Sequence, residues 1–429
     1  MRADEQKQEH ARSYYAATAN EKTDYPVLEG RQLADVCIVG GGFTGVASAL
    51  TLAERGYSVA LLEANRIGWG ASGRNGGQLI NGISGLSRIA KKHGHCIADL
   101  LWDMRWRGNT IIRERVARYG IDCDLKDGYV EVARKPRQLA DVRESAEERS
   151  ARNFPYRYEV WDRDQTAEML GTDAFFGAFA CFRDGHLHPL NLCIGEARAA
   201  HRLGVRIFEQ SPVTEIEHGT RPTVRTATGS VRSDAVLLAG NAHSRLEPEH
   251  LSNLIFPAGS YMIATEPLPA AVARSINPLD VAVCDLNYVV DYFRLSADRR
   301  LLFGGTCNYS GRDPSSIAAY IRPRLLRIYP QLENVRVEYE WGGKIGIVLN
   351  RVPTVGRIRG DVYYCQGYSG HGVNGTHLMG EVMADAIAGT MERFDLFANI
   401  KHTRLPGSRW VGNQIIALGM LYYKLKDLL

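Results

Sequence analysis

The chain has 429 residues, more than one hydrophobic core usually organises, so we expect two domains. Basic and acidic residues are interspersed and the formal net charge is only +4, which argues against a dedicated nucleic-acid surface. The eight cysteines form no CxxC pair and no cluster with histidine, which predicts no metal site and is typical of reduced thiols in a cytoplasmic protein.

Residues 1–33 are predicted to form a polar arm laid over the body of the protein. The arm contains Ser13-Tyr14-Tyr15 and lacks an apolar core followed by a cleavage site, so we expect no signal peptide. We also expect no membrane span, because the most apolar stretch, residues 36–53, is interrupted by four glycines.

A strand, a glycine turn and a helix are predicted next. The β-branched segment 35–39 runs into the pattern Gly40-x-Gly42-x-x-Gly45, and a helical apolar pattern follows. In a dinucleotide-binding turn, Gly40 allows the tight bend, Gly42 lets the backbone approach a pyrophosphate, and Gly45 lets the helix pack closely on the strand. The helix N-terminus adds unpaired N–H groups and a positive dipole end for the phosphates.

A second strand, residues 59–62, ends on Glu63. An acid at this place accepts a hydrogen bond from a ribose 2′-hydroxyl and repels a 2′-phosphate, which disfavours NADP. The turn and Glu63 together predict a dinucleotide site, and they allow NAD and FAD equally.

The loop of residues 68–78 contains more glycine than ordinary packing requires, so its backbone can approach a flat polar ring system. Arg74 offers a charge-assisted donor for a phosphate, and Asn75 and Gln78 offer amide groups for ring edges. We interpret this second glycine loop as part of the same cofactor site.

Beyond the loop the pattern of elements changes near residue 100. Helices are expected at 97–119 and 136–152, and alternating strands between residues 258 and 341 suit a large antiparallel sheet over one face of a cofactor. A last strand, 362–365, runs into the glycine-rich loop 367–373 and a helix.

The predicted fold is therefore α/β, with two domains. A discontinuous, Rossmann-like nucleotide domain is expected to comprise residues 34–100, 177–245 and 350–429. An α+β substrate domain with a large, mostly antiparallel sheet is expected to comprise residues 101–176 and 246–349.

Several stretches together carry a family resemblance. They are residues 66–78, His186-Leu187-His188-Pro189, Ala239-Gly240-Asn241, Trp341-Gly342-Gly343 and Gln366 through Val373, and with the arm they extend over nearly the whole chain. They resemble the FAD-dependent amine and amino-acid oxidases of the D-amino-acid oxidase, glycine oxidase and sarcosine oxidase superfamily. Within it, they are most similar to the bacterial γ-glutamylputrescine oxidases.

The resemblance implies FAD as the cofactor, bound non-covalently. It assigns cofactor contacts to Gly40, Gly42, Thr44, Gly45, Glu63, Ser72, Arg74, Asn75, Gly76, Gly77, Gln78, Val213, Gly240, Gly370, His371, Gly372 and Val373. Residues 370–372 would bring a helix N-terminus near the flavin N1–C2=O edge, where the dipole stabilises negative charge on the reduced ring. For His371, helix capping and a direct flavin contact are equally good interpretations. Cys365 lies near this element, and a buried strand cysteine is the favoured interpretation over covalent attachment.

One position departs from the family pattern. Glycine-oxidase-like enzymes carry an arginine two positions after the last glycine of the W-x-G element, where it clamps the substrate carboxylate; here that position is Ile345. An amine without an adjacent carboxylate fits better. Lys344 is a candidate for assisting the reaction with oxygen, with a solvated or structural lysine as the favoured alternative, and Trp341 and Gln78 are candidate substrate contacts.

The implied reaction is oxidation of a primary amine in polyamine catabolism. The substrate would be γ-glutamylputrescine or a related γ-glutamylated polyamine, converted to the aldehyde with release of ammonia and H2O2, and oxygen would accept the electrons. The alternatives are a flavin oxidase or dehydrogenase for a free polyamine, an N-methyl secondary amine or an amino acid, with a quinone as another possible acceptor. A flavin-binding protein with a sensory or structural role is the alternative from a different class.

Overall fold

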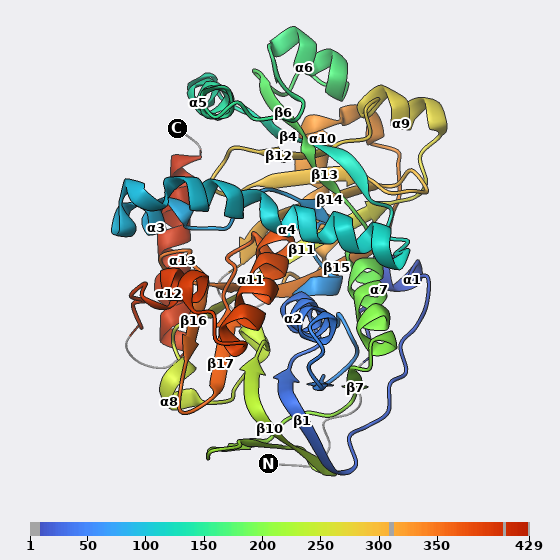
Figure 1. Ribbon diagram of the computed structural model, residues 1–429. Coiled ribbons are helices and arrows are strands. Elements are labelled where there is room, and N and C mark those ends of the chain that lie inside the picture. Colours follow the sequence, from blue (N-terminus) through green and yellow to red (C-terminus); the bar gives the residue numbers. More distant parts are fainter. Residues whose placement is uncertain (1–8, 309–312, 406–408, 428–429) are drawn as a thin grey trace.

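The computed structural model describes residues 9–308, 313–405 and 409–427. Within these ranges the strands form two sheets, one of eight strands and one of nine. Three helices, α2 (Phe43–Glu54), α7 (Pro189–Arg202) and α11 (Gly372–Ile387), pack side by side against the first sheet (Figure 1).

The first sheet has the strand order β16-β17-β10-β1-β2-β7, with β9 on β10 and β8 on β9. Its strands are β1 (Gly30–Val39), β2 (Val59–Leu62), β7 (Arg206–Phe208), β8 (Glu215–Glu217), β9 (Thr223–Arg225), β10 (Gly229–Leu238), β16 (Thr354–Arg357) and β17 (Val362–Gln366). The five strands from β17 to β7 are parallel. This arrangement confirms the Rossmann-like sheet, and it brings the carboxyl ends of β1, β2, β10 and β17 to one edge.

Strand β1 illustrates why this sheet forms. Val36 and Ile38 pack against the helix layer, whereas Cys37 packs into a separate cluster on the opposite face. A strand covered on both faces needs a continuous apolar run, and residues 36–39 supply one.

The second sheet has the order β15-β11-β14-β13-β12-β4-β6-β3, with β5 on β6. Its strands are β3 (Gln78–Leu79), β4 (Lys126–Val132), β5 (Tyr158–Trp161), β6 (Ala178–His186), β11 (Phe256–Thr265), β12 (Ala282–Asp285), β13 (Asp291–Leu295), β14 (Leu301–Asn308) and β15 (Val337–Ile347). All its pairings are antiparallel except that of β12 with β4, which confirms the large, mostly antiparallel sheet.

The other helices surround the two sheets (Figure 1). They are α1 (Tyr14–Ala17), α3 (Leu86–His93), α4 (Ala98–Tyr119), α5 (Leu139–Ala151), α6 (Arg163–Leu170), α8 (Pro248–Leu251), α9 (Ala270–Ile276), α10 (Ile317–Ile328), α12 (Glu392–Ala398) and α13 (Arg409–Lys426). Helix α4 packs across α11 and α7, and α10 packs against β11, β14 and β15. In the described ranges, no helix is both long enough and apolar enough to cross a membrane.

The path of the chain between the sheets differs in places from the predicted boundaries. Strand β6 was expected in the nucleotide domain but pairs with β4 in the second sheet, so the chain returns to the first sheet only after His186. The C-terminal helix α13 was also expected there, yet it lies against β11, where Gly412 meets the ring of Phe256. Conversely, α4 belongs by its packing to the helix layer of the first sheet. Residues far apart in sequence decide which of the two sheets each element joins or covers. Local sequence patterns therefore do not reveal it.

Candidate functional site

The first glycine turn is closed so tightly that side chains do not fit. Gly40 has φ +115°, and a Cβ on Gly45 would lie 1.9 Å from the carbonyl oxygen of Gly40. Gly42 is the N-cap of α2, and a Cβ there would come within 2.9 Å of Ser72 Oγ. The three glycines therefore form a tight backbone turn at the carboxyl edge of the first sheet, which we call the glycine cradle because the sequence predicts that it holds a pyrophosphate.

Glu63 stands beside this cradle at the end of β2. Its carboxylate accepts the N–H of Gly41 at 2.6 Å and the N–H of Asn65 at 2.8 Å. Burial raises the pKa of the Glu63 carboxyl, and the backbone donors act in the opposite direction. The acid is thus fixed next to the turn, where an acceptor for a ribose hydroxyl is needed.

The second glycine loop is tied to the start of α2 and shaped by its own side chains. Ser72 Oγ accepts the N–H of Phe43 at 2.9 Å. Asn75 donates through Nδ2 to the carbonyl groups of Ala71 and Ser72, and its Oδ1 accepts the N–H of Gly77 at 2.8 Å. Asn75, expected to offer an amide to a ring edge, therefore uses both ends of that amide to hold the loop.

Arg74 joins the same loop to the second sheet. Its Nε donates to the carbonyl of Trp69 at 2.8 Å, one terminal nitrogen donates to the carbonyl of Gly342 at 3.3 Å, and the guanidinium stacks 4.4 Å from the Trp69 ring. Burial lowers the pKa of Arg74. From the β15 side, Trp341 Nε1 donates to the Arg74 carbonyl at 3.0 Å.

Two residues that the sequence did not single out complete this contact. Arg294 donates through Nε to the carbonyl of Gly76 at 2.9 Å, and a Cβ on Gly76 would lie 2.7 Å from the ring of Tyr292. Both come from β13, whose alternation gave no sign of a special role. We call the face of the second sheet that carries Tyr292, Arg294 and Trp341 the inner face, because it is the face that meets the second glycine loop. Gln78, in β3 of the same sheet, donates through Nε2 to the Val283 carbonyl at 2.9 Å.

The N-terminal arm closes one side of the loop. Trp69 Nε1 donates to the Glu9 carbonyl at 3.0 Å, and Arg66 pairs with the Glu9 carboxylate at 2.8 Å. Tyr15 is fully buried, with its ring 5.3 Å from that of Trp341, and its hydroxyl accepts from Arg294 at 3.2 Å. The arm is therefore part of the structure that holds the loop.

The third strand end at this edge is that of β17. The N–H of Gly367 donates to Asn241 Oδ1 at 3.0 Å, which connects it to the turn that Gly240 begins after β10. The hydroxyl groups of Thr44 and Tyr368 lie 2.8 Å apart. The structure thus brings the glycine turn, the turn after β10 and the loop after β17 together, although about 200 and 330 residues separate them from the first.

His371 occupies the N-cap position of α11 without making a side-chain capping hydrogen bond, so the capping interpretation is not supported. Burial, and then the charge of Arg351, lower the pKa of His371. A Cβ on Gly370 or Gly372 would meet nothing within 4 Å, so the start of this helix is open to a ligand. Cys365 is buried with its sulfur 3.2 Å from the Tyr368 hydroxyl, and burial raises its pKa to about 12. A thiol held in this way is poorly suited to covalent attachment of a cofactor.

Lys344 lies away from this assembly, whereas Val213 follows Ser211, whose N–H donates to the Glu63 carbonyl at 2.9 Å. Lys344 is exposed, and it follows Gly343, which faces Arg74. Because side chains alternate along a strand, Lys344 points with Gly342 toward Tyr261, on the other face of β15. The geometry therefore favours the solvated alternative for Lys344. Val213 is half-buried in the segment before β8.

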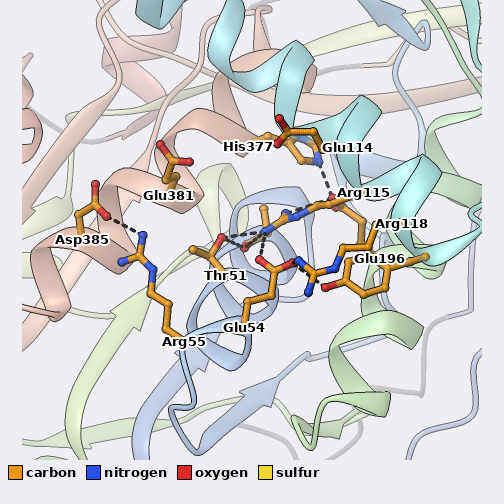
Figure 2. A network of polar contacts seen from close by, with 12 residues as sticks. Thr51, Glu54, Arg55, Glu114, Arg115, Arg118, Glu196, His377, Glu381 and Asp385 are labelled. Atoms are coloured by element: carbon orange, nitrogen blue, oxygen red, sulfur yellow. Dashed lines mark hydrogen bonds and ion pairs between the residues drawn. The ribbon is translucent and has the colours of Figure 1, made fainter.

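A buried ion network supports the helix layer behind the glycine turn (Figure 2). Glu196 on α7 accepts from His377 Nε2 on α11 at 3.0 Å and from Arg115 on α4 at 3.2 Å, and Arg115 donates to Thr51 Oγ1 on α2 at 2.8 Å. Burial alone would raise the pKa of Glu196, but the charges of His377 and Arg115 outweigh burial and hold it below its usual range. Sequence patterns missed this network, since each member stands in an ordinary helical context.

One hollow lies at the wrong edge of the first sheet for a nucleotide. It has a volume of about 580 Å³ and is lined by Asp35, Arg55, Tyr57 and Asp361, at the amino ends of the parallel strands. Ligands of such sheets bind outside the carboxyl ends, so we assign the site to the glycine cradle.

Comparison with known proteins agrees with this geometry. A profile of the FAD dependent oxidoreductase family, abbreviated DAO, matches residues 35–386. The chain belongs to this family. The bound cofactor is therefore FAD, and the residues present fit it: a glycine cradle with an acid at the end of β2 for the ADP part, and the second loop and the α11 N-terminus for the flavin part.

Relatives match along almost the whole chain. The chain is 45% identical to the γ-glutamylputrescine oxidoreductase of Escherichia coli K12 over 98% of this chain and 99% of that protein. It is 43% identical to the probable oxidoreductase OrdL of Haemophilus influenzae over 98% of each. The crystal structure of glycine oxidase from Geobacillus kaustophilus superposes with a TM-score of 0.71 at 23% identity, covering 88% of this chain and 100% of that one, which shows a shared fold.

Proposed function

We propose that the protein oxidises the primary amine of γ-glutamylputrescine, or of a closely related γ-glutamylated polyamine, to the aldehyde. Ammonia and H2O2 are the other products, and oxygen is the electron acceptor. The proposal is supported by the full-length similarity to a γ-glutamylputrescine oxidoreductase. It places the protein in the cytoplasm, in polyamine catabolism.

The observation that carries the proposal is the environment of Ile345. At the position where an arginine would clamp an α-carboxylate, Ile345 packs with apolar side chains of β11, β15 and α13, including Phe256, Ala258 and Ile416. Arg294, on the inner face, is already engaged by Gly76, Leu187 and Tyr15. An α-amino acid would therefore lose its bidentate anchor, whereas an amine that carries no neighbouring carboxylate loses nothing.

The bound FAD supplies the hydride acceptor for this reaction. The chain contributes position and a dry environment. Gly76 and Tyr292 bring the second loop against the inner face, and burial raises the pKa of the Tyr292 hydroxyl so that it stays neutral. The backbone N–H groups at the start of α11 supply positive dipole ends, which favour negative charge on the reduced ring. A partly desolvated site also favours the neutral amine, the form that can release a hydride.

Anaerobic mixing of the holoprotein with a panel of amines tests the proposal. We expect γ-glutamylputrescine to bleach the visible flavin absorbance faster than putrescine, N-methyl amines or glycine. Readmission of air should restore the absorbance and release H2O2. Bleaching by N-methyl amines alone would contradict the proposal, and a flavin that no amine reduces would favour a sensory or structural role.

A further inference from the structure

A row of side chains crosses the inner face away from the second glycine loop. Tyr292 on β13 is in register with Cys284 on β12, which is in register with Glu131 on β4, and Glu131 is in register with Phe179 on β6. Residues in register on neighbouring strands project from the same face of a sheet. Since Tyr292 contacts Gly76 in the second loop, Glu131 lies on the same face, two strands further along.

Glu131 is unusual for a carboxylate in such a place. It is only partly accessible, and its carboxylate has no hydrogen-bond or ion-pair partner in the part of the chain that the structure describes. Interior carboxylates are normally paired, because an unpaired buried charge is costly. An unpaired acid that keeps some accessibility is therefore a candidate for binding a cationic ligand.

The groups around Glu131 show which ligand would fit. On the strands, the charge of Glu131 acts on the Tyr129 hydroxyl and the Cys284 thiol, and burial raises the pKa of each. From the helices, Arg149 on α5 and Arg105 on α4 act on it as cations, and Asp141 on α5 as a weaker anion. Arg149 stacks 4.3 Å from the ring of Phe179, and its Nε has no partner within the described ranges. Arg149 also donates through Nη1 to the Ser145 carbonyl at 2.8 Å, which leaves its Nε free among the described residues. One carboxylate next to such a guanidinium suits a ligand end that carries both an ammonium and a carboxylate group.

The spacing agrees with such a ligand. Strands in a sheet lie roughly 4.8 Å apart, so Glu131 stands about 10 Å from Tyr292 across the row. In γ-glutamylputrescine, about ten bonds separate the amine to be oxidised from the α-ammonium, which extended span roughly 12 Å at ~3.5 Å for every three bonds. An amine placed beside Tyr292 and the second loop would thus bring the amino-acid end of the substrate to Glu131.

We propose that Glu131 binds the α-ammonium group of the γ-glutamyl substrate and is the residue that selects it over other amines. The inference rests on the proposed function and names the specificity contact within the same site. Glu131 acts by binding alone, and the hydride and proton transfers at the other end of the substrate do not involve it.

The experiment compares γ-glutamylputrescine with N-glutarylputrescine, which differs only by lacking the α-ammonium. We expect wild-type protein to have a KM about tenfold lower for the γ-glutamyl substrate, with similar kcat values. In Glu131→Gln this preference should disappear, since KM rises for γ-glutamylputrescine and stays constant for the glutaryl analogue. Glu131→Asp, which keeps the charge on a shorter side chain, should retain part of the preference. An equal preference in wild type and Glu131→Gln would overturn the inference.

A binding measurement provides a readout that does not depend on turnover. γ-Glutamyl-n-butylamide lacks the amine to be oxidised, and calorimetry should show it binding about tenfold more weakly to Glu131→Gln than to wild-type holoprotein. The matched control is Asp127→Asn, which removes a negative charge from the same strand. Asp127 is 62% exposed and pairs with Arg113 at 2.6 Å, so we expect no change in affinity. Equal weakening in both variants would show a long-range charge effect and contradict a direct contact.

The pH dependence adds an independent check. Burial raises the pKa of Glu131, while Arg149 and Arg105 oppose the shift. A raised pKa means that the carboxylate is lost as the pH falls, so the preference for the γ-glutamyl substrate should weaken on the acid side in wild type and be flat in Glu131→Gln. The failure of this inference is distinguishable from failure of the proposed function. If γ-glutamylputrescine does not reduce the flavin at all, the proposed function fails; if it does so without the preference, only the role of Glu131 fails.

Discussion

The carboxyl edge of the first sheet and the inner face of the second sheet meet the same loop in different ways. At the edge, the contacts are made by backbone: the Gly40 carbonyl approaches Gly45, and Gly41 donates to Glu63. On the inner face they are made by side chains, such as Tyr292 and Trp341, that come from separate strands. The glycine turn and Glu63 at the edge are close together in sequence, whereas the face is assembled by strand pairing.

This difference teaches where each kind of specificity lies. A cofactor site made of backbone tolerates no added Cβ, so its residue types are narrowly restricted and can be identified in the sequence. A sheet face made of side chains can change one residue, as at Ile345, without altering the sheet, and we propose that this face determines the substrate. The predictions below test this contrast by disturbing each region in turn.

The largest expected effect is a loss of stability when the buried ion network of Glu196, in the helix layer of the first sheet, is disrupted. In Glu196→Gln, the buried charge of Arg115 loses its counter-charge and His377 loses its carboxylate partner, so the free energy of unfolding should fall by about 3–5 kcal/mol in urea denaturation. Because the pKa of Glu196 is lowered in the fold, its stabilisation is present above the usual carboxyl range and is lost as the pH falls through the lowered value. In Glu196→Gln, the free energy of unfolding should not show this fall at low pH. An unchanged midpoint would contradict the role of the network, and Glu217→Gln, in an exposed pair with Arg225, serves as a control without effect.

The next largest effect is expected on FAD binding when the glycine cradle is disturbed. Gly45→Ala would place a Cβ against the rigid Gly40 carbonyl, so α2 must move away from β1, at a cost of about 1–3 kcal/mol. We expect purified protein to contain much less FAD, measured as the ratio of visible to ultraviolet absorbance. The control is Gly219→Ala, where a Cβ meets nothing within 4 Å. A full complement of FAD in Gly45→Ala would show that the cradle is not the cofactor site.

A smaller effect is expected where the inner face grips the second loop. Trp341→Phe removes one hydrogen bond to the Arg74 carbonyl and keeps an aromatic ring, so a loss of about 1 kcal/mol and a several-fold weaker FAD affinity should follow. The matched control is Trp161→Phe, because Trp161 Nε1 donates to Glu159 at 2.8 Å on β5, away from the loop. Titration of the apoprotein of each variant with FAD measures the two affinities. Equal affinities for the two variants would mean that the inner face does not hold the loop.

The smallest expected effect is at Lys344. Lys344→Met should leave the rate of flavin reoxidation by oxygen unchanged, since the side chain is exposed on the face of β15 opposite to Gly343 and Arg74. Stopped-flow mixing of the reduced protein with oxygenated buffer checks this. If the rate of flavin reoxidation fell tenfold or more, Lys344 would assist the reaction with oxygen, as the sequence suggested.

The sequence indicated the cofactor domain because its signals are local. The spacing of Gly40, Gly42 and Gly45, with Glu63 at the end of the next strand, reflects close approaches of backbone within some 25 residues, and the structure shows those approaches. Ile345 was likewise visible, since it is one substitution in a short motif. The exact tasks of Asn75 and Arg74 were not visible, because an amide or a guanidinium in a loop can bind a ligand or hold its own backbone equally well.

The tertiary structure decided everything that depends on partners distant in the chain. The placement of β6 and α13 follows from pairing and packing across the molecule, and so do the contacts of Tyr292 and Arg294 with the second loop. The row from Tyr292 to Glu131 exists only because β13, β12 and β4 are neighbours in register, although about 160 residues separate its ends. By itself the sequence determined that the protein binds a dinucleotide cofactor, because a tight backbone turn needs particular residues, and its family resemblance indicated FAD. Strand register decided which side chains share the inner face.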